Sequence, residues 1–233
     1  MRVLGLIPAR GGSKGIPRKN IKLLNGKPLL QYTTEVALQS KLLSKVIISS
    51  DDDEIIRIGK KMGVEVPFKR PNLLANDNSP TLPVIQHALH FFKDKYNEEF
   101  DAVCLLQVTT PFRSVEFLDN AIQKFIKSNT DSLISVQKVP HTYNPHWVFV
   151  ENHLNNLMIA TGDKEIIARR QELPEAFHRD GSIYITKTKV LLDNNSLYGD
   201  SISYIESPKE LYVNIDTEKD WEKAESIVKG EID

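Results

Sequence analysis

Basic residues are concentrated directly after the first apolar run of the chain, residues 3–7. They lie within ten consecutive positions: Arg10, Lys14, Arg18 and Lys19. Between them, Gly11 and Gly12 allow the backbone to turn sharply and to expose successive N–H groups, and such a turn binds anions. For a glycine pair alone, a turn with solvated lysines is the simpler interpretation. The preceding strand and the density of bases favour a polyphosphate site instead.

Two common phosphate motifs do not describe this loop. The P-loop requires Gly-x-x-x-x-Gly-Lys-Ser/Thr, and the dinucleotide fingerprint requires Gly-x-Gly-x-x-Gly. The glycines of this loop, Gly11, Gly12 and Gly15, satisfy neither pattern. A nicotinamide oxidoreductase is therefore the weakest interpretation of the sequence.

A second group that could do chemistry lies near the carboxyl end. Asn214 and Asp216 stand two positions apart in an apolar run, residues 211–217, that is typical of a strand. On a strand both side chains share one face, so their oxygens can converge on one hard cation. Mg²⁺ bound to a triphosphate fits this pair.

Structural roles are the better interpretation of the other side chains that could bind a metal or act as a nucleophile. The aspartates at 51–53 precede a helical pattern, so a helix cap is a better interpretation than a metal site. Three histidines fall in one irregular segment: His141, His146 and His153. Their spacing fits no compact zinc pattern and no cysteine accompanies them. The single cysteine, Cys104, lies inside an apolar run and is predicted to be a buried core residue rather than a nucleophile.

The overall composition is that of a globular protein. The 233 residues are 40% hydrophobic and 26% charged, with a formal net charge of −1. So small a net charge creates no general attraction for nucleic acid, and any anion must be held by a local cluster. No stretch approaches the roughly 18 apolar residues of a membrane span, and no signal-peptide pattern opens the chain. We therefore expect no membrane association and a cytoplasmic location.

Alternating strand and helix patterns must position these groups. Apolar or alternating runs predict strands, with an edge strand at 64–69, at these residues: 3–7, 45–50, 64–69, 101–109, 132–139, the second half of 177–186, and 211–217. Helical periodicity predicts helices at these residues: 29–38, 55–63, 82–96, 114–127 and 218–228. The alternation indicates an α/β fold with a Rossmann-like, mostly parallel sheet covered by helices on both faces. In such sheets ligands bind at the carboxyl ends of the strands.

The regular pattern stops after the strand predicted at 132–139. Residues 140–169 are irregular and rich in histidine, asparagine and aromatic side chains. We interpret residues 1–233 as one domain with a subdomain of short strands inserted at about 140–180.

The basic loop carries a resemblance to a known family. Residues 7–20 (IPARGGSKGIPRKN) resemble the signature of the acylneuraminate cytidylyltransferases, also called CMP-sialic acid synthetases, and later segments extend the similarity over almost the whole chain. The resemblance implies a nucleotidyltransferase that joins a nonulosonic sugar acid to CMP from CTP and releases pyrophosphate. It also implies the nucleotide-diphospho-sugar transferase type of fold. The inserted subdomain would then help to build a homodimer and reach the neighbouring site.

The resemblance also assigns roles to individual residues. The nucleotide would be bound by Ala9, Arg10, Gly11, Gly12, Ser13, Asn20, Arg70 and Thr81. Without the resemblance, the segment that holds Arg70 and Thr81 would be interpreted as a loop and a helix cap. The sugar acid would be bound by Gln107, Arg170, Asp180 and Tyr184.

Some positions depart from the family pattern. The segment of Gln107 usually reads Gln-Pro-Thr-Ser-Pro-Leu-Arg, of which this chain keeps Gln107, Thr109, Pro111 and Arg113. Asp180 stands where sialate-using members usually carry asparagine, and residues 197–198 (Leu-Tyr) stand where they carry Phe-Phe. A carboxylate at position 180 would repel a carboxylated substrate unless it faced a hydroxyl group. The acceptor is therefore left open between N-acetylneuraminate and a deaminated, legionaminic or pseudaminic acid.

The predicted chemistry needs charge neutralisation more than covalent catalysis. The catalytic residues are expected to be Arg10, Lys14, Lys19 and Asp216, with Mg²⁺ held by Asp216 and Asn214. Since the family more often has two aspartates here, Asn214 leaves the metal more dependent on Asp216. A nucleotide-binding module without turnover is the alternative from another class, and the combination of Lys14, Lys19 and Asp216 argues against it.

Overall fold

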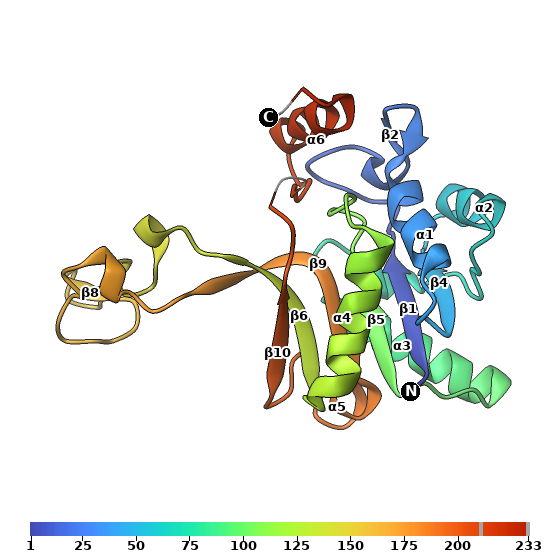
Figure 1. The fold of residues 1–233 in the computed structure, drawn as a ribbon. Helices are drawn as coiled ribbons and strands as arrows, with labels where there is room; N and C mark the ends of the chain where they lie inside the picture. The colour runs from blue at the N-terminus through green and yellow to red at the C-terminus, as the bar shows by residue number, and fades with distance from the viewer. Residues whose placement is uncertain (210–211, 232–233) are drawn as a thin grey trace.

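The sheet contains strands from both halves of the chain. Within residues 1–209 and 212–231, which the computed structural model describes, six strands form the central sheet in the order β10-β6-β9-β5-β1-β4 (Figure 1). Their bounds are β1 Val3–Pro8, β4 Lys45–Ser49, β5 Ala102–Leu105, β6 Ser132–Lys138, β9 Phe177–Lys187 and β10 Ile202–Glu206. The neighbours β1/β4, β1/β5 and β10/β6 are parallel, and only β9 runs antiparallel to both of its neighbours in this sheet.

Helices cover both faces of this sheet, as the alternation predicted. One hydrophobic cluster includes Val3 and Ile7 of β1 with the inner sides of α1 (Leu29–Gln39), α4 (Val115–Ser128) and α6 (Glu218–Lys229). The other includes Leu4 and Leu6 of β1 with α3 (Thr81–Tyr96) and α5 (Thr188–Leu192). Alternate residues of β1 thus face opposite layers, which is the side-chain pattern of a strand buried on both sides. The predicted fold class is confirmed.

Polar side chains fix the starts of several helices. Asp52 caps α2 (Asp53–Lys61) by accepting from the amides of Glu54 and Ile55, so the aspartates at 51–53 include the predicted cap. Ser114 caps α4, and Thr217 and Asp220 form a capping box at the start of α6. The side chain of Cys104 in β5 is fully buried, and burial raises the pKa of its thiol to about 12, in agreement with a core role.

Some expected strands are shorter or absent. β5 ends at Leu105, because the chain then bends away to form the loop at 106–113. The predicted edge strand at 64–69 makes only isolated bridges, to β4 at Ile47 and to Ser50 just beyond it. The expected strand at 211–217 is wrong for the part that the structure describes, since residues 212–216 form no strand. Leu211 lies outside the described residues. β10 and α5 were not among the expected elements.

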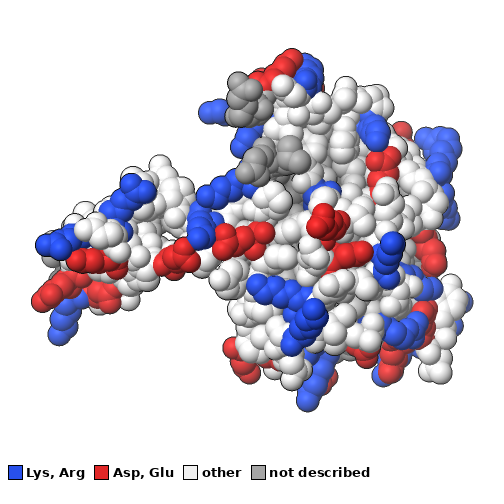
Figure 2. Space-filling model, viewed as in Figure 1, with Lys and Arg blue, Asp and Glu red and all other residues white. Residues whose placement is uncertain are grey.

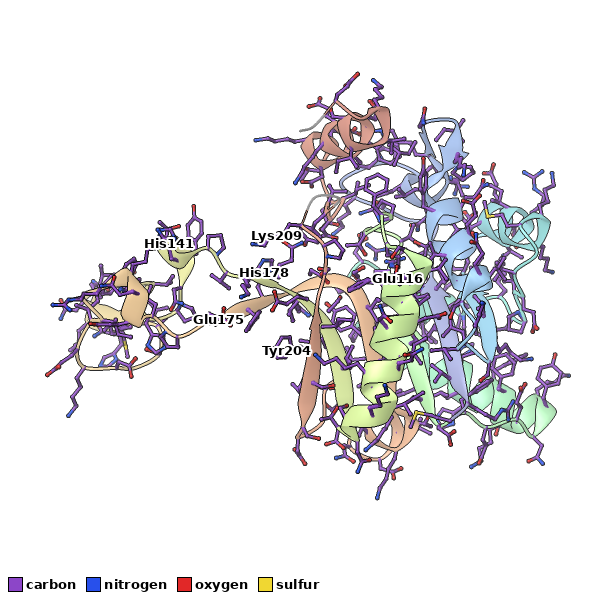
Figure 3. The ribbon with its side chains drawn as sticks, viewed as in Figure 1. Glu116, His141, Glu175, His178, Tyr204 and Lys209 are labelled. Atoms are coloured by element: carbon purple, nitrogen blue, oxygen red, sulfur yellow. The ribbon has the colours of Figure 1, made fainter. Side chains whose placement is uncertain are left out.

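Residues 139–176, here called the arm, project from the body of the molecule (Figure 1). The arm carries a small hairpin of β7 (Phe149–Glu151) and β8 (Leu157–Ile159) and two short 3-10 helices, η3 (His141–Tyr143) and η4 (Arg170–Glu172). Figure 3 shows Glu175 and His178 along the part of the chain that joins the arm to the body. Few apolar side chains of the arm are buried.

Short elements complete the chain around the amino-terminal loop. They are η1 (Lys19–Ile21), β2 (Leu23–Leu24), β3 (Lys27–Pro28) and η2 (Asn72–Leu74). Among the helices of the described ranges, we find none with the length and apolar character needed to cross a membrane.

Candidate active site

A cleft of about 330 Å³ opens where the carboxyl ends of β1 and β5 lead into loops. This is the edge at which ligands bind in open α/β sheets. Many residues predicted from the sequence line it: Arg10, Gly12, Ser13, Lys19, Asn20, Arg70, Thr81, Gln107 and Asp216. Its volume is within the usual range of small-molecule sites, about 300–1,000 Å³.

The two ends of the chain meet at Lys19. The ammonium of Lys19 donates to the carbonyl oxygen of Ile215 at 2.6 Å and to Asp216 Oδ1 at 3.1 Å. Gly15 makes the approach possible, since a Cβ atom at this position would lie 2.1 Å from the carbonyl oxygen of Asp216. The basic loop and the carboxylate therefore belong to one site, although 197 positions separate Lys19 from Asp216.

Arg18 does not join the cations of the cleft. Its backbone is in the left-handed region, with φ at 56°, and its guanidinium pairs with Asp52 at 2.5 Å and Glu54 at 2.6 Å. The hydrogen bond from Arg18 lowers the pKa of Asp52, despite partial burial. Nearby, Asp51 accepts from the amide of Gly11 at 3.1 Å. The acidic residues at the start of α2 thus hold the basic loop through their contacts with Gly11 and Arg18.

The segment after η2 supplies acceptors to the remaining cations. Arg10 donates to the carbonyl oxygen of Asn76 at 2.8 Å, and its guanidinium lies 3.0 Å from Asp77. The other carboxylate oxygen of Asp77 lies 3.1 Å from the ammonium of Lys14. Asn20 Nδ2 donates to the carbonyl oxygen of Arg10 at 2.8 Å and so fixes the backbone of the loop at Arg10. Asp77 could not be predicted as a site residue, because an aspartate in a polar loop carries no signal of its partners.

Arg70 and Thr81 lie on the wall of the cleft. Arg70 is buried and donates through Nε to Ser49 Oγ at 3.0 Å and through Nη2 to the carbonyl oxygen of Ser49. Burial lowers its pKa to about 10, so the side chain stays cationic near neutral pH. Thr81 is the first residue of α3. A helix start and a fixed guanidinium both favour an anionic ligand.

Gln107 lies in the cleft on a loop that a buried arginine holds. Arg113 donates to the carbonyl oxygen of Gln107 at 2.7 Å and to Thr110 Oγ1 at 2.8 Å. Gly181 has a φ of 83°, and a Cβ there would lie 3.3 Å from Gln107 Oε1. Glycine at position 181 thus keeps the space beside the Gln107 amide open. The sequence motif contained Arg113, but the residue received no role from it.

Three predicted sugar-acid residues lie outside this cleft. Asp180 is buried, accepts from the hydroxyl groups of Ser135 and Ser207, and accepts from the amide of Ser182 at 2.8 Å. Tyr184 is buried within β9, and Arg170 lies at the start of η4 in the arm. Within one chain, Gln107 is therefore the member of this predicted set that faces the cleft.

The donor set near the carboxyl end fits a phosphate-bound magnesium ion better than a cage made by protein alone. Asp216 is 61% exposed, and its Oδ2 accepts from Asn214 Nδ2 at 2.7 Å. In residues 1–209 and 212–231 there is no group of three or more histidine, cysteine or acidic residues suited to a metal. Mg²⁺ is commonly held by one or two carboxylates together with substrate phosphates, and Asp216 meets that requirement.

Three comparisons relate the chain to known proteins. The model of a family described as cytidylyltransferase matches residues 4–228. A pseudaminic acid cytidylyltransferase of Campylobacter jejuni is 34% identical over 98% of this chain and 97% of its own. N-acylneuraminate cytidylyltransferase A of Danio rerio is 32% identical over 97% of this chain and 50% of its own. The structure of a CMP:2-keto-3-deoxy-manno-octonic acid synthetase complexed with CTP has a TM-score of 0.72 at 19% identity and covers 100% of both chains.

Proposed function

Because the chain belongs to the cytidylyltransferase family and is thus a nucleotidyltransferase, we propose that it joins a nonulosonic sugar acid to CMP from CTP and releases pyrophosphate. The observation that carries this proposal is the contact of Lys19 with Asp216 inside the cleft. It unites a phosphate-binding loop with a carboxylate suited to a phosphate-bound cation.

The reaction is an in-line attack of the anomeric hydroxyl on the α-phosphorus of CTP. A bond forms between that oxygen and phosphorus, the bond to the β-phosphate oxygen breaks, and pyrophosphate leaves. Such transfers depend on orientation and on neutralising charge as it develops on the phosphate oxygens. Arg10, Lys14 and Lys19 supply that charge, together with the backbone N–H groups of Gly12 and Ser13, whereas the N–H group of Gly11 donates to Asp51.

Magnesium is part of this proposal. Asp216 would hold the ion, Asn214 donates a hydrogen bond to the same carboxylate, and Mg²⁺ would supply Lewis-acid neutralisation of the phosphate oxygens. Lys19 orients Asp216 by binding its other oxygen. A second proposed role of Asp216 is to accept the proton of the attacking hydroxyl.

The nucleotide is proposed to lie between the amino-terminal loop and α3. Asn20, Arg70 and Thr81 line this side of the cleft, where the buried Arg70 offers a fixed positive charge. Ala9 is fully buried beside Arg10, so only its backbone could take part in nucleotide binding. A reaction that consumes CTP also suits a cytoplasmic location.

The acceptor is proposed to be pseudaminic acid or a related acid rather than N-acetylneuraminate. Gln107 lies in the cleft where this acid would meet the nucleotide. Asp180 gives this choice no direct support, because it lies outside the cleft and its oxygens accept from Ser135, Ser182 and Ser207. The support comes from relatives: the pseudaminic acid cytidylyltransferase of Campylobacter jejuni is 34% identical, and so is a CMP-N,N'-diacetyllegionaminic acid synthase of Legionella pneumophila.

We further propose a homodimer in which the arm contacts a second copy. The exposed large hydrophobic residues of the arm between Phe149 and Ile166 are Phe149, Val150, Leu154, Leu157, Met158 and Ile166. Exposed apolar side chains gathered on one projecting segment favour a protein interface. Arg170, on the same arm, would then contribute to the site of the partner.

The test is pyrophosphate release from CTP with a panel of acids: pseudaminic, legionaminic, deaminated and N-acetylneuraminic. We expect release that depends on both the acid and Mg²⁺, with the highest kcat/KM for pseudaminic acid. Selective use of N-acetylneuraminate would contradict the proposed acceptor. Binding of CTP without turnover with any acid would favour the nucleotide-binding module.

A further inference from the structure

Asp77 places a carboxylate among the cations of the proposed triphosphate subsite. One of its oxygens lies 3.0 Å from the Arg10 guanidinium and the other 3.1 Å from the Lys14 ammonium. Both cations come from the loop that binds phosphate in the proposed function. A phosphate group that bridged Arg10 and Lys14 would use the same donors that Asp77 uses.

The segment around Asp77 is held at this position by contacts of its own. Ser79 Oγ accepts from the amide of Asn76 at 3.1 Å and donates to the carbonyl oxygen of Leu73 at 3.1 Å. The carbonyl oxygen of Asn76 also accepts from Arg10 at 2.8 Å. The turn therefore presents the carboxylate to the cations.

The exposure of the three groups is consistent with an exchangeable contact. The side chains of Arg10 and Asp77 are 32% and 37% exposed, and that of Lys14 is 74% exposed. Ion pairs with this much solvent access are weak and are screened by salt. A triphosphate, with several negative charges, competes well against a single carboxylate.

We propose that Asp77 is the internal counter-ion of the triphosphate subsite. It pairs with Arg10 and Lys14 before the nucleotide arrives, gives way to the phosphates, and returns when pyrophosphate leaves. Asp77 is thus a positioning residue that weakens binding of polyphosphates to this subsite. The inference rests on the proposed function, because it assumes that Arg10 and Lys14 bind the triphosphate.

The test is the affinity of Asp77→Asn for pyrophosphate and for CTP. The amide keeps the size of the side chain but removes its charge, so the ligand no longer competes with a carboxylate. We expect both dissociation constants, measured by calorimetry in EDTA and again with Mg²⁺, to fall by about two- to tenfold. Asp77→Glu keeps a carboxylate and should bind like the unaltered protein.

A matched control neutralises a surface carboxylate elsewhere. Glu99 pairs with Lys93 at 2.8 Å just before β5, at the opposite end of that strand from the cleft, and Glu99→Gln should leave both affinities unchanged. If Asp77→Asn binds no tighter, or more weakly, than the unaltered protein, the inference is overturned. Weaker binding only with Mg²⁺ would instead make Asp77 a metal ligand and also overturn it. If the unaltered protein binds neither ligand, the proposed function itself fails.

Discussion

At the scale of single residues, Lys19 is the side chain that joins the two ends of the chain at the cleft. Its side chain is mostly buried, and its ammonium contacts one carbonyl oxygen and one carboxylate oxygen of the carboxyl-terminal segment. A buried cation is stable only when it is paired and hydrogen-bonded, and these two contacts provide both. Lys19 thus orients Asp216 and also adds a positive charge to the lining of the cleft.

We predict that Lys19→Ala lowers kcat/KM for CTP by about 10²-fold or more, because a fixed charge near the phosphates is lost. Pyrophosphate release measures this loss, and circular dichroism checks that the fold is intact. Lys22→Ala is the control, since Lys22 pairs with Glu218 at 3.0 Å and does not line the cleft. Near-normal turnover of purified Lys19→Ala would remove Lys19 from the mechanism.

The sequence predicted which residues gather at the cleft better than it predicted their partners. Charge density around Gly11 and Gly12 indicated the phosphate loop, and most of the predicted loop residues line the cleft. The same cluster of basic residues included Arg18, but its left-handed backbone directs the Arg18 side chain toward Asp52. Asp77 could not be found in this way, because its role comes from contacts between segments more than 60 positions apart.

At the scale of elements, the start of α2 anchors the basic loop. Asp52 caps the helix and pairs with Arg18, so one carboxylate joins two elements. Its pKa is lowered by Arg18 first, and the amides of Ile55 and Glu54 add to this effect. A carboxyl group whose pKa is lower in the folded state stabilises the fold above its unfolded pKa and loses this effect as the pH falls through the folded value.

We predict that Asp52→Ala lowers the free energy of unfolding by roughly 1–2 kcal/mol at pH 7, for loss of the cap and of a partly exposed ion pair. The difference from the unaltered protein should stay constant down to about pH 4 and shrink below it, as Asp52 becomes protonated. Urea unfolding at several pH values measures it. Asp53→Ala, which removes only an exposed pair with Lys69, should cost less, and an equal cost would contradict this account.

Helices were predicted more accurately than strands, for a physical reason. Helical periodicity and capping residues such as Ser114 and Thr217 are local signals, and these helices begin within a few residues of their predicted starts. A strand needs a neighbouring strand to pair with, and residues 212–216 form no strand. The Ile215 amide does donate to the Thr109 carbonyl oxygen at 2.8 Å, but this contact is not part of a β-ladder. Its alternation reflects burial of Val213 and Ile215 in the core.

At the scale of the whole molecule, the arm carries exposed apolar side chains on a segment that projects from the body. In the view of Figure 2, acidic and basic side chains are interspersed over the body, and uncharged surface is also visible on the arm. Trp147 donates to the carbonyl oxygen of Ile167 at 2.6 Å, so the arm has an internal structure of its own. Its exposed residues are therefore available to a second copy without unfolding.

We predict that Leu157→Glu converts the dimer to a monomer, because Leu157 is 71% exposed within the apolar surface of the arm. A buried charge without a partner would be costly at such an interface. Light scattering coupled to size exclusion gives the mass directly. Leu23→Glu changes a residue that is 60% exposed on the body and should remain dimeric. A monomeric unaltered protein would contradict the homodimer.

The central claim is cytidylyl transfer from CTP, and the fate of the individual phosphates tests it most directly. CTP labelled at the α-phosphate should transfer its label to the sugar acid, and CTP labelled at the γ-phosphate should release its label as pyrophosphate. Transfer of the γ-label to the acid would show phosphoryl transfer instead, and would contradict the account.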